Sequence, residues 1–324
     1  MHTISDTINH LHLGEATTFE GLAIFPLFGD HVRDADYLTL DEALEQGQAR
    51  VIEVSEAGEV PNLMFDNLGD RKVLLVDGDE LIGAKQNRII NLTILVPAHT
   101  KIEIPVSCVE AGRWSHTTAG FCSAKRAMFS RGRAAKAAQV TVRMKRSGER
   151  YSDQSEVWDN IAECSASLDV RSSTDSMSDI YESYEQRLDG YREAFKAQDG
   201  QVGALFAIHG KIQGLELFDS SKTFSHYLER LVSSYALSSL ADRSDDKDGV
   251  TPDTDTFMES VKNASAERFD ALGEGEDLRL SGQALAGGAL LAEDRKVHLA
   301  AFAIQGAGGK AGYRSRHFHN RPVH

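Results

Sequence analysis

Residues 74–114, LLVDGDELIGAKQNRIINLTILVPAHTKIEIPVSCVEAGRW, decide the fold that the sequence predicts. The part at 89–97 is rich in Ile, Leu, Val and Thr, which is typical of a β-strand. The part at 101–109 alternates apolar and polar residues, as a half-buried strand does. The turn-forming run PAHT at 97–100 joins the two, so we expect an antiparallel hairpin.

Polar side chains gather at one end of this expected hairpin. Some enter the first strand and others leave the second, and an antiparallel pair returns to the place where it started. We therefore expect the two groups to be neighbours in space. The residues are Glu80, Lys85, Gln86, Asn87 and Arg88 on the way in, and Cys108, Glu110, Arg113 and Trp114 on the way out.

The returning strand points two chemically active groups inward. With a period of two residues, Cys108 and Glu110 share the face of Ile104 and Val106, which is the face expected to be buried. A buried carboxylate needs a partner or acquires a raised pKa. Glu110 and Glu80 are thus candidate general bases, and Cys108 is a candidate nucleophile.

Purely structural roles remain open for the same residues. Arg113 can pair with Glu110 for stability alone, and Gln86 and Asn87 can satisfy backbone groups of a loop. Cys108 can equally be a buried thiol, because a nucleophilic cysteine requires a base and a lowered pKa.

The remaining candidates suit an anionic ligand. Arg and Lys bind phosphates, Gln and Asn bind hydroxyl groups, and a Trp ring can stack on a base. His298 lies in the alternating strand expected near 296–304 and is either a ligand-binding group or a hydrogen-bonded core histidine. The predicted ligand-binding set is Lys85, Gln86, Asn87, Arg88, Arg113, Trp114 and His298.

Outside this stretch, the sequence indicates an α+β fold, with an antiparallel, sandwich-like sheet core covered by several helices. Expected strands lie near 22–28, 50–55, 73–76, 202–218 as a hairpin, 278–291 and 296–304. Expected helices lie near 38–44, where Thr39 and Glu42 form a capping box, and near 155–168, 177–196, 221–240 and 255–272.

Residues 20–304 are expected to form one globular domain with three parts. The first, about 20–114, is rich in strands, and the last, 151–304, mixes helices and strands. Between them, 115–150 is basic and rich in small residues, and we expect a long loop with little regular structure. Such a loop is either solvated or a mobile cover over an anionic ligand.

Two further segments are expected to lack regular structure. Residues 305–324, rich in glycine and basic residues, are expected to be a flexible tail, and the acidic run 242–254 is expected to be an exposed loop.

Composition and motifs narrow the functional class. The 324 residues include 49 acidic and 35 basic ones, a net charge of −14, which disfavours binding to nucleic acid or to anionic membranes. Three cysteines without regular spacing and the lack of a secretion signal or an apolar span predict a cytoplasmic protein. No HExxH, CxxC, GxGxxG, P-loop or GxSxG pattern occurs. The sequence therefore predicts no metal site and indicates neither a particular cofactor nor an oligomeric state.

Several runs of the chain resemble one bacterial family. They are GDELIGAKQNR at 78–88, LVP at 95–97, IPVSCVE at 104–110, GRW at 112–114, and the later pieces QSEVW at 154–158, LFDS at 217–220 and SSYAL at 233–237. This pattern resembles the ADP-ribosylglycohydrolase- and rhodanese/phosphatase-associated protein domain over about 20–304. The resemblance implies a link to ADP-ribose and NAD-derived nucleotide metabolism through the family's associations.

Three functions follow as hypotheses. In the first, the polar cluster binds a small phosphorylated ligand related to ADP-ribose or NAD and hydrolyses it with Glu110 or Glu80 as general base. In the second, the chain is a non-catalytic binding or assembly module, and the cluster is a structural polar network. A third hypothesis is an accessory protein that binds a partner through the basic loop expected at 125–146.

Overall fold

The computed structural model of the protein describes residues 4–30, 33–55, 61–115, 117–242 and 251–304. These ranges contain α-helices and mostly antiparallel strands, so the expected α+β class is confirmed. The strands do not form the expected sandwich. They divide into a closed barrel, a nine-stranded sheet and a small three-stranded sheet.

The barrel is built from the first half of the chain. Its strands follow one another around the wall in the order β11-β6-β5-β12-β8-β9. A single cluster of apolar side chains, among them Val51, Leu63, Phe65, Ile90 and Val106, fills its interior. The strands are β5 (Ala49–Glu53), β6 (Asn62–Asn67), β8 (Asp79–Gly83), β9 (Arg88–Ile90), β11 (Lys101–Cys108) and β12 (Phe121–Ala127).

The three-stranded sheet, β10-β7-β4, lies next to the barrel, and its strand β4 leads directly into a short helix. Its strands are β4 (Tyr37–Thr39), β7 (Lys72–Leu75) and β10 (Ile94–Val96), and the helix is α2 (Leu40–Glu45). The Thr39 side chain accepts a hydrogen bond from the Glu42 backbone, and the Glu42 side chain accepts one from the Thr39 backbone. The capping box predicted from the sequence is therefore confirmed.

The nine-stranded sheet has the order β1-β3-β13-β14-β18-β17-β16-β15, and β2 pairs with β3 beside β1. Chain segments from both ends thus meet in one sheet, and the hairpin predicted over 202–218 is confirmed as β13 with β14. The strands are β1 (Leu11–Leu13), β2 (Thr17–Phe19), β3 (Leu22–Gly29), β13 (Gln201–Ile208), β14 (Lys211–Phe218), β15 (Ser265–Asp270), β16 (Glu276–Gly282), β17 (Leu285–Ala292) and β18 (Arg295–Ala303).

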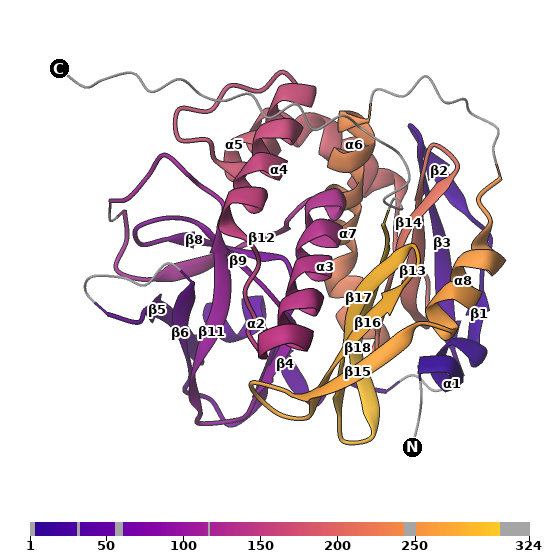
Figure 1. Ribbon diagram of the computed structural model, residues 1–324, viewed down its shortest axis with the longest axis horizontal. Helices are drawn as coiled ribbons and strands as arrows, with labels where there is room; N and C mark the ends of the chain where they lie inside the picture. Colours follow the sequence, from indigo (N-terminus) through magenta and orange to yellow (C-terminus); the bar gives the residue numbers. More distant parts are fainter. Residues whose placement is uncertain (1–3, 31–32, 56–60, 116, 243–250, 305–324) are drawn as a thin grey trace.

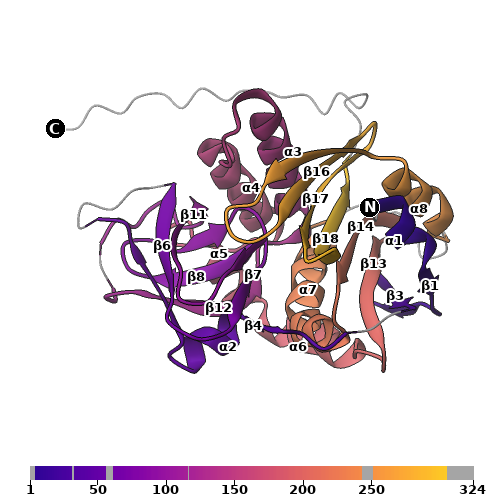
Figure 2. The same ribbon diagram turned by 90° about the horizontal axis from the view of Figure 1, so that it is seen from below.

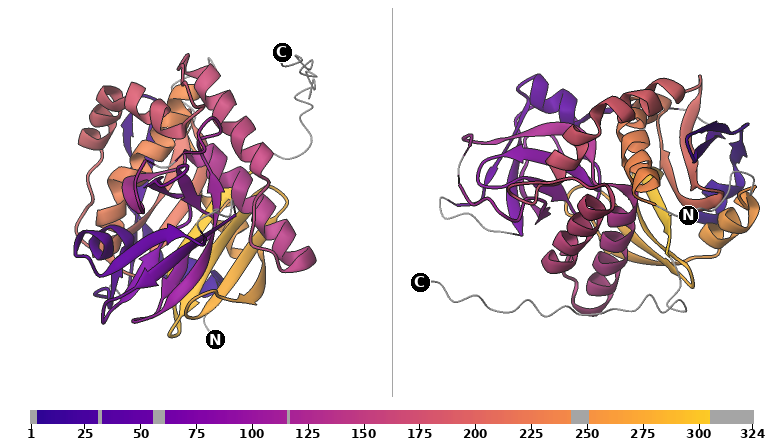
Figure 3. Two further views of the ribbon diagram at one scale, coloured as in Figure 1. Left: turned by 90° about the vertical axis from the view of Figure 1, so that its left-hand side faces the viewer. Right: turned by 90° about the horizontal axis from the view of Figure 1, so that it is seen from above.

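Helices separate the barrel from the large sheet. Figure 1 shows the barrel on the left, the large sheet on the right, and α3 and α7 between them; Figures 2 and 3 show the same arrangement from other sides. The largest apolar cluster runs through this middle layer and joins Ile89 and Val109 to Phe206 and Tyr235. The helices are α1 (Ile4–Asn9), α3 (Ser130–Ser147), α4 (Gln154–Ser167), α5 (Met177–Ser183), α6 (Glu185–Ala194), α7 (Ser221–Ala241) and α8 (Thr254–Lys262).

The hairpin predicted within 89–109 is wrong in its pairing. The run at 89–97 breaks into two short strands, β9 and β10, and β10 pairs with β7 in the neighbouring sheet. Only the start of the run pairs with the returning strand, where Val106, Ser107 and Cys108 lie opposite Ile90, Ile89 and Arg88. Between the two strands, Asn91 Nδ2 donates to the Arg150 carbonyl, and Thr93 Oγ1 lies 2.8 Å from His298 Nδ1.

The long basic loop predicted over 115–150 is also wrong. This segment contains strand β12 and the 18-residue helix α3. Gly148 ends the helix in the left-handed conformation (φ 75°), and its N–H donates to the Met144 carbonyl. The helix buries Arg133 and Lys136 together with Val140 and Met144, so these two basic residues are part of the core, and the segment does not form a mobile cover.

Smaller differences concern element boundaries. The helix expected over 177–196 is interrupted at Tyr184, where α5 ends and α6 begins. The helix expected over 255–272 stops at Lys262, and β15 follows it. The strand expected over 278–291 is a hairpin of β16 and β17. The expected tail at 305–324 and most of the loop at 242–254 lie outside the described residues, and the single domain over 20–304 stays a prediction.

Candidate functional site

The two polar groups predicted to be neighbours do meet, at one end of the barrel. Arg88, at the start of β9, lies directly opposite Cys108, at the end of β11. The Val109 N–H donates to the Asn87 carbonyl at 3.0 Å, which continues the pairing one step beyond the strands. The expected proximity is thus correct. It comes from the pairing of β9 with β11 and not from the turn expected at 97–100.

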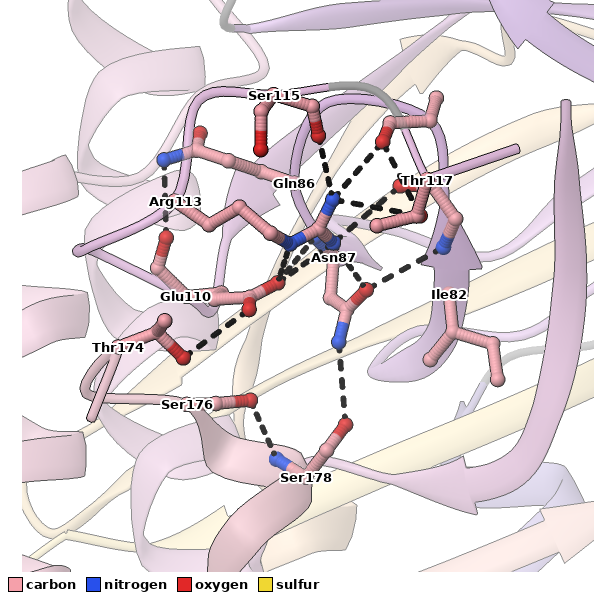
Figure 4. Close-up of polar contacts among 12 residues, drawn as sticks. Ile82, Gln86, Asn87, Glu110, Arg113, Ser115, Thr117, Thr174, Ser176 and Ser178 are labelled. Carbon is pink, nitrogen blue, oxygen red and sulfur yellow. Dashed lines mark hydrogen bonds and ion pairs between the residues drawn. The ribbon is translucent and has the colours of Figure 1, made fainter. Parts of the chain in front are cut away.

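Glu110 is the centre of a hydrogen-bonded network at this end of the barrel (Figure 4). Arg113 donates to its Oε2 from Nε at 2.8 Å, and Nη2 of the same guanidinium is 2.6 Å from that oxygen. Thr174 Oγ1 donates to the other oxygen at 3.1 Å, and the Asn87 backbone N–H donates to Oε2 at 3.3 Å. Both carboxylate oxygens are therefore engaged by the protein itself.

Gln86 and Asn87 complete the network. Gln86 Nε2 donates to the Glu110 carbonyl at 2.9 Å, and Asn87 Oδ1 accepts from Arg113 Nη2 at 2.9 Å. Asn87 Nδ2 donates to Ser178 Oγ, at the start of α5, at 3.2 Å. These side chains hold the loops that follow β8 and β11 against α5, which is the structural role left open by the sequence.

This network predicts a measurable loss of stability. Gln86→Ala and Glu110→Gln should each lower the free energy of unfolding by about 1–3 kcal/mol, because each leaves buried partners unsatisfied. Equilibrium urea unfolding measures the change. Glu103→Gln is the matched control, since Glu103 is an exposed residue of β11, the strand that leads to Glu110. Equal stabilities for all three variants would contradict a structural role for the network.

Arg88 differs from these residues, because its guanidinium is buried without a full set of partners. Its side chain is fully inaccessible to solvent. Nη1 donates to Gln86 Oε1 at 3.0 Å, whereas Nε and Nη2 have no hydrogen-bond partner among the described residues. No carboxylate in the described ranges lies within ion-pair distance, and burial lowers the pKa of Arg88 below its ordinary value.

The alternation of the strands directs Arg88 into the barrel. Arg88 shares a face of β9 with Ile90, and its partner Cys108 shares a face of β11 with Val106; both apolar residues belong to the barrel interior. By the same rule Glu53 follows Val51 inward on β5. Both oxygens of Glu53 are buried without a hydrogen-bond partner among the described residues. We call Glu53, Arg88 and Cys108 the polar end of the barrel.

Glu53 is not among the site residues predicted from the sequence, although the alternation of its strand points to it. In the strand run RVIEVS, period two places the carboxylate on the face of Val51, and the same rule had been applied to Glu110.

Burial raises the pKa of the Cys108 thiol to about 11, and the Arg88 guanidinium only partly offsets this effect. The thiol therefore stays protonated at neutral pH, which does not favour its predicted role as a nucleophile.

Trp114 and Lys85 lie at the same end, nearer to the surface. The Trp114 side chain is about half exposed, and its ring has two cations near it: Lys85 Nζ at 5.3 Å from the centroid and the Arg88 guanidinium carbon at 5.8 Å. An exposed indole beside two cations is a surface on which a planar or anionic group can bind.

Glu80 points away from the polar end of the barrel. It lies opposite Ile89 in the β8–β9 pair, and Ile89 belongs to the apolar cluster outside the barrel. Ser178 Oγ donates to its Oε1 at 2.8 Å, and Arg126 Nε lies 3.2 Å from its Oε2. Burial raises the pKa of Glu80 to about 7, although Arg126 and Ser178 act in the opposite direction.

His298 is not part of this site. It lies on β18, where its Nδ1 is 2.8 Å from Thr93 Oγ1 and its Nε2 is 3.3 Å from Glu216 Oε2. Glu216 in turn accepts hydrogen bonds from both terminal nitrogens of Arg133, on α3. These are the contacts of a hydrogen-bonded core histidine, the alternative left open for it.

Within the described ranges, no group of three or more His, Cys, Asp or Glu side chains is placed to hold a metal ion. None of the helices in these ranges has the length and apolar character needed to span a membrane.

A family model described as ARG and Rhodanese-Phosphatase-superfamily-associated Protein domain, ARPP-1, matches residues 10–302. No curated protein and no solved structure matches the chain.

Proposed function

The chain belongs to the ARPP-1 family, and on that basis we propose that it binds a small phosphorylated ligand of the nucleotide type at the polar end of the barrel. The family's name supports an association with ARG and rhodanese-phosphatase proteins. The ligand class is proposed from the side chains of the site.

The observation that carries the proposal is the buried guanidinium of Arg88. Removing such a charge from water is costly unless a counter-ion and hydrogen bonds replace the lost hydration. Arg88 has neither a carboxylate in ion-pair distance nor partners for Nε and Nη2 in the described part of the chain. A phosphate group of a ligand supplies both, because a guanidinium presents adjacent donors that match its charged oxygens.

Neighbouring groups suit the rest of a nucleotide-type ligand. Glu53 offers two unpaired acceptor oxygens at the same end, which complement ribose hydroxyl groups or amino groups. Trp114 offers an exposed aromatic face, and Lys85 lies beside it. A guanidinium, a carboxylate and an indole ring thus lie at one end of a closed barrel. The mouth of a barrel is a common position for ligand sites.

We do not extend this proposal to hydrolysis, because none of the predicted catalytic residues fits the role of general base or nucleophile at the polar end of the barrel. Glu80 has a pKa of about 7, which suits a general base, but its side chain points away from this end. Arg113 and Thr174 engage Glu110, and the Cys108 thiol stays protonated.

Arg88→Met tests the proposal. The wild-type melting temperature should rise with ADP-ribose or NAD, by an amount equivalent to about 3 kcal/mol at a hundredfold excess over Kd, and the variant should show no shift. Without ligand, the variant should be more stable than the wild type by about 1 kcal/mol or more, because an unsatisfied buried charge is removed.

Arg50→Met is the matched control, since Arg50 is an exposed arginine of β5 in the same barrel that pairs with Asp66 at 2.7 Å. It should keep the ligand-induced shift. The proposal fails if no nucleotide in the panel shifts the wild type, or if Arg88→Met shifts as the wild type does.

The second candidate function, a non-catalytic accessory module with a structural polar cluster, is favoured by the network around Glu110. In this case Arg88 supports the loops through Gln86, and Arg88→Met should destabilise the protein. The sign of the stability change therefore separates the two functions.

A further inference from the structure

A cavity of about 600 Å³ lies outside the barrel, between β12, α5, α6 and α7. Small-molecule sites commonly have volumes of about 300–1,000 Å³. It is distinct from the polar end of the barrel, because its wall contains Arg126 and Arg230 and none of Glu53, Arg88 and Cys108.

Two arginines of its wall are held in place by carboxylates, one of which, Glu185, itself lines the cavity. Arg126 Nε is 3.2 Å from the buried Glu80. Arg192 Nη2 is 2.5 Å from Glu185 and 2.6 Å from Asp189. Guanidinium groups that are fixed in this way lose little conformational entropy when they bind a ligand.

A third guanidinium converges on the same space from α7. Arg230 Nη1 is 2.5 Å from the buried Asp79, and Nη2 pairs with Asp41. Arg192 Nη1 also donates to Ser233 Oγ at 3.2 Å, which places a hydroxyl group beside the cations. Three cations thus reach one cavity from a strand and two helices.

Carboxylates also line the cavity, and its three guanidinium groups are paired to different degrees. Arg192 and Arg230 each have an ion-pair contact of 2.5 Å, whereas the contacts of Arg126 are longer, 3.2 Å to Glu80 and 3.7 Å to Glu182. The wall carboxylates Glu182, Glu185 and Glu229 are 68%, 55% and 63% exposed, so water screens them strongly. The charge of Arg126 is therefore the least compensated of the three.

We propose that this cavity is a second binding site, for a small ligand that carries an oxyanion, either a phosphate or a carboxylate. The oxyanion lies between Arg126 and Arg192. Arg126 Nη2 has donor capacity for it, since the carboxylate that pairs with this nitrogen, Glu182, is 3.7 Å away. The ring of Tyr181, 5.4 Å from the Arg126 guanidinium carbon, forms an apolar side of the site.

Isothermal titration with inorganic phosphate and with malonate, at constant ionic strength set with chloride, tests this site. Arg88→Met serves as the background, so that any binding reports on the cavity and not on the polar end of the barrel. We expect one site per chain for at least one of the two anions. Binding of phosphate alone indicates a phosphorylated ligand, and binding of malonate alone indicates a carboxylate ligand.

Arg192→Gln and Arg126→Gln in that background should each weaken binding tenfold or more, which is the scale of a lost charge-assisted hydrogen bond. Arg187→Gln is the matched control, because Arg187 is an exposed residue of the same helix α6 that pairs with Glu20 outside the cavity. It should bind as the background does. Absence of binding, or equal affinity in all variants, overturns the inference.

Discussion

Arg133→Ala is expected to lower the free energy of unfolding by about 3–5 kcal/mol, which is the scale for breaking a buried ion pair by removing one partner. Arg133 Nη1 donates to Glu216 Oε1 at 2.6 Å, and Nη2 donates to Oε2 at 3.3 Å, with both side chains inaccessible to solvent. Burial alone would raise the pKa of the Glu216 carboxyl, but the Arg133 guanidinium holds that pKa below its ordinary value. Without Arg133, the core keeps an uncompensated carboxylate.

Two further variants make this experiment specific. Arg131→Ala, two positions earlier on α3, should change stability by less than about 0.5 kcal/mol, because its ion pair with Glu163 is exposed on both sides. Arg133→Met combined with Glu216→Leu should recover most of the loss, since apolar residues of similar volume can replace a buried pair. Denaturant unfolding gives all three values. A neutral Arg133→Ala would mean that α3 contributes little to the core.

The contribution of Glu80 to stability should fall as the pH rises from about 4.5 to about 7. Its pKa is about 7 in the folded protein, whereas the ordinary value for a glutamate is 4.5, so the folded state keeps a proton that the unfolded chain has already lost in this range. The free energy of unfolding then decreases with pH, by roughly 3 kcal/mol over the whole window. Below pH 4.5 both states are protonated, and above pH 7 both are ionised, so the contribution is constant outside the window.

Glu80→Gln isolates this effect, because it removes the titrating group and keeps an oxygen that can accept from Ser178. The stability of the variant relative to the wild type should rise by roughly 3 kcal/mol between pH 4.5 and pH 8. Glu182→Gln, which changes an exposed carboxylate that also faces Arg126, should leave the pH profile of the wild type unchanged. Parallel profiles for Glu80→Gln and the wild type would show that Glu80 does not titrate in this window.

The two experiments bear on different parts of the molecule. Arg133 joins α3 to the large sheet through Glu216 on β14. Lys136 on the same helix joins it to the barrel side, since it donates to the Ile90 and Asn91 carbonyls at 3.0 and 2.9 Å and pairs with Asp77. Glu80 links the Glu110 network to the cavity between β12, α5, α6 and α7 through Ser178 and Arg126. The polar end of the barrel depends directly on neither of them.

The sequence by itself determined the local features of the protein. Period-two alternation identified inward-facing residues on the strands, and the Thr39–Glu42 box marked the start of a helix, because both signals arise from neighbours within a few residues. The resemblance at 78–114 led to the family that residues 10–302 match. The alternating strand patterns, with helical patterns between them, were enough to predict the α+β class.

Only the tertiary structure decided which strands pair and which charges are buried. β10 pairs with β7 and not with β11, because the backbone groups of β11 are already paired with β6 and β9 in the barrel wall. The same packing separates Glu80 and His298 from Arg88, and it buries Arg133 and Lys136, whose basic character suggested exposure. Burial of a charge depends on a partner far away in the chain, such as Glu216 for Arg133, and local sequence does not encode that distance.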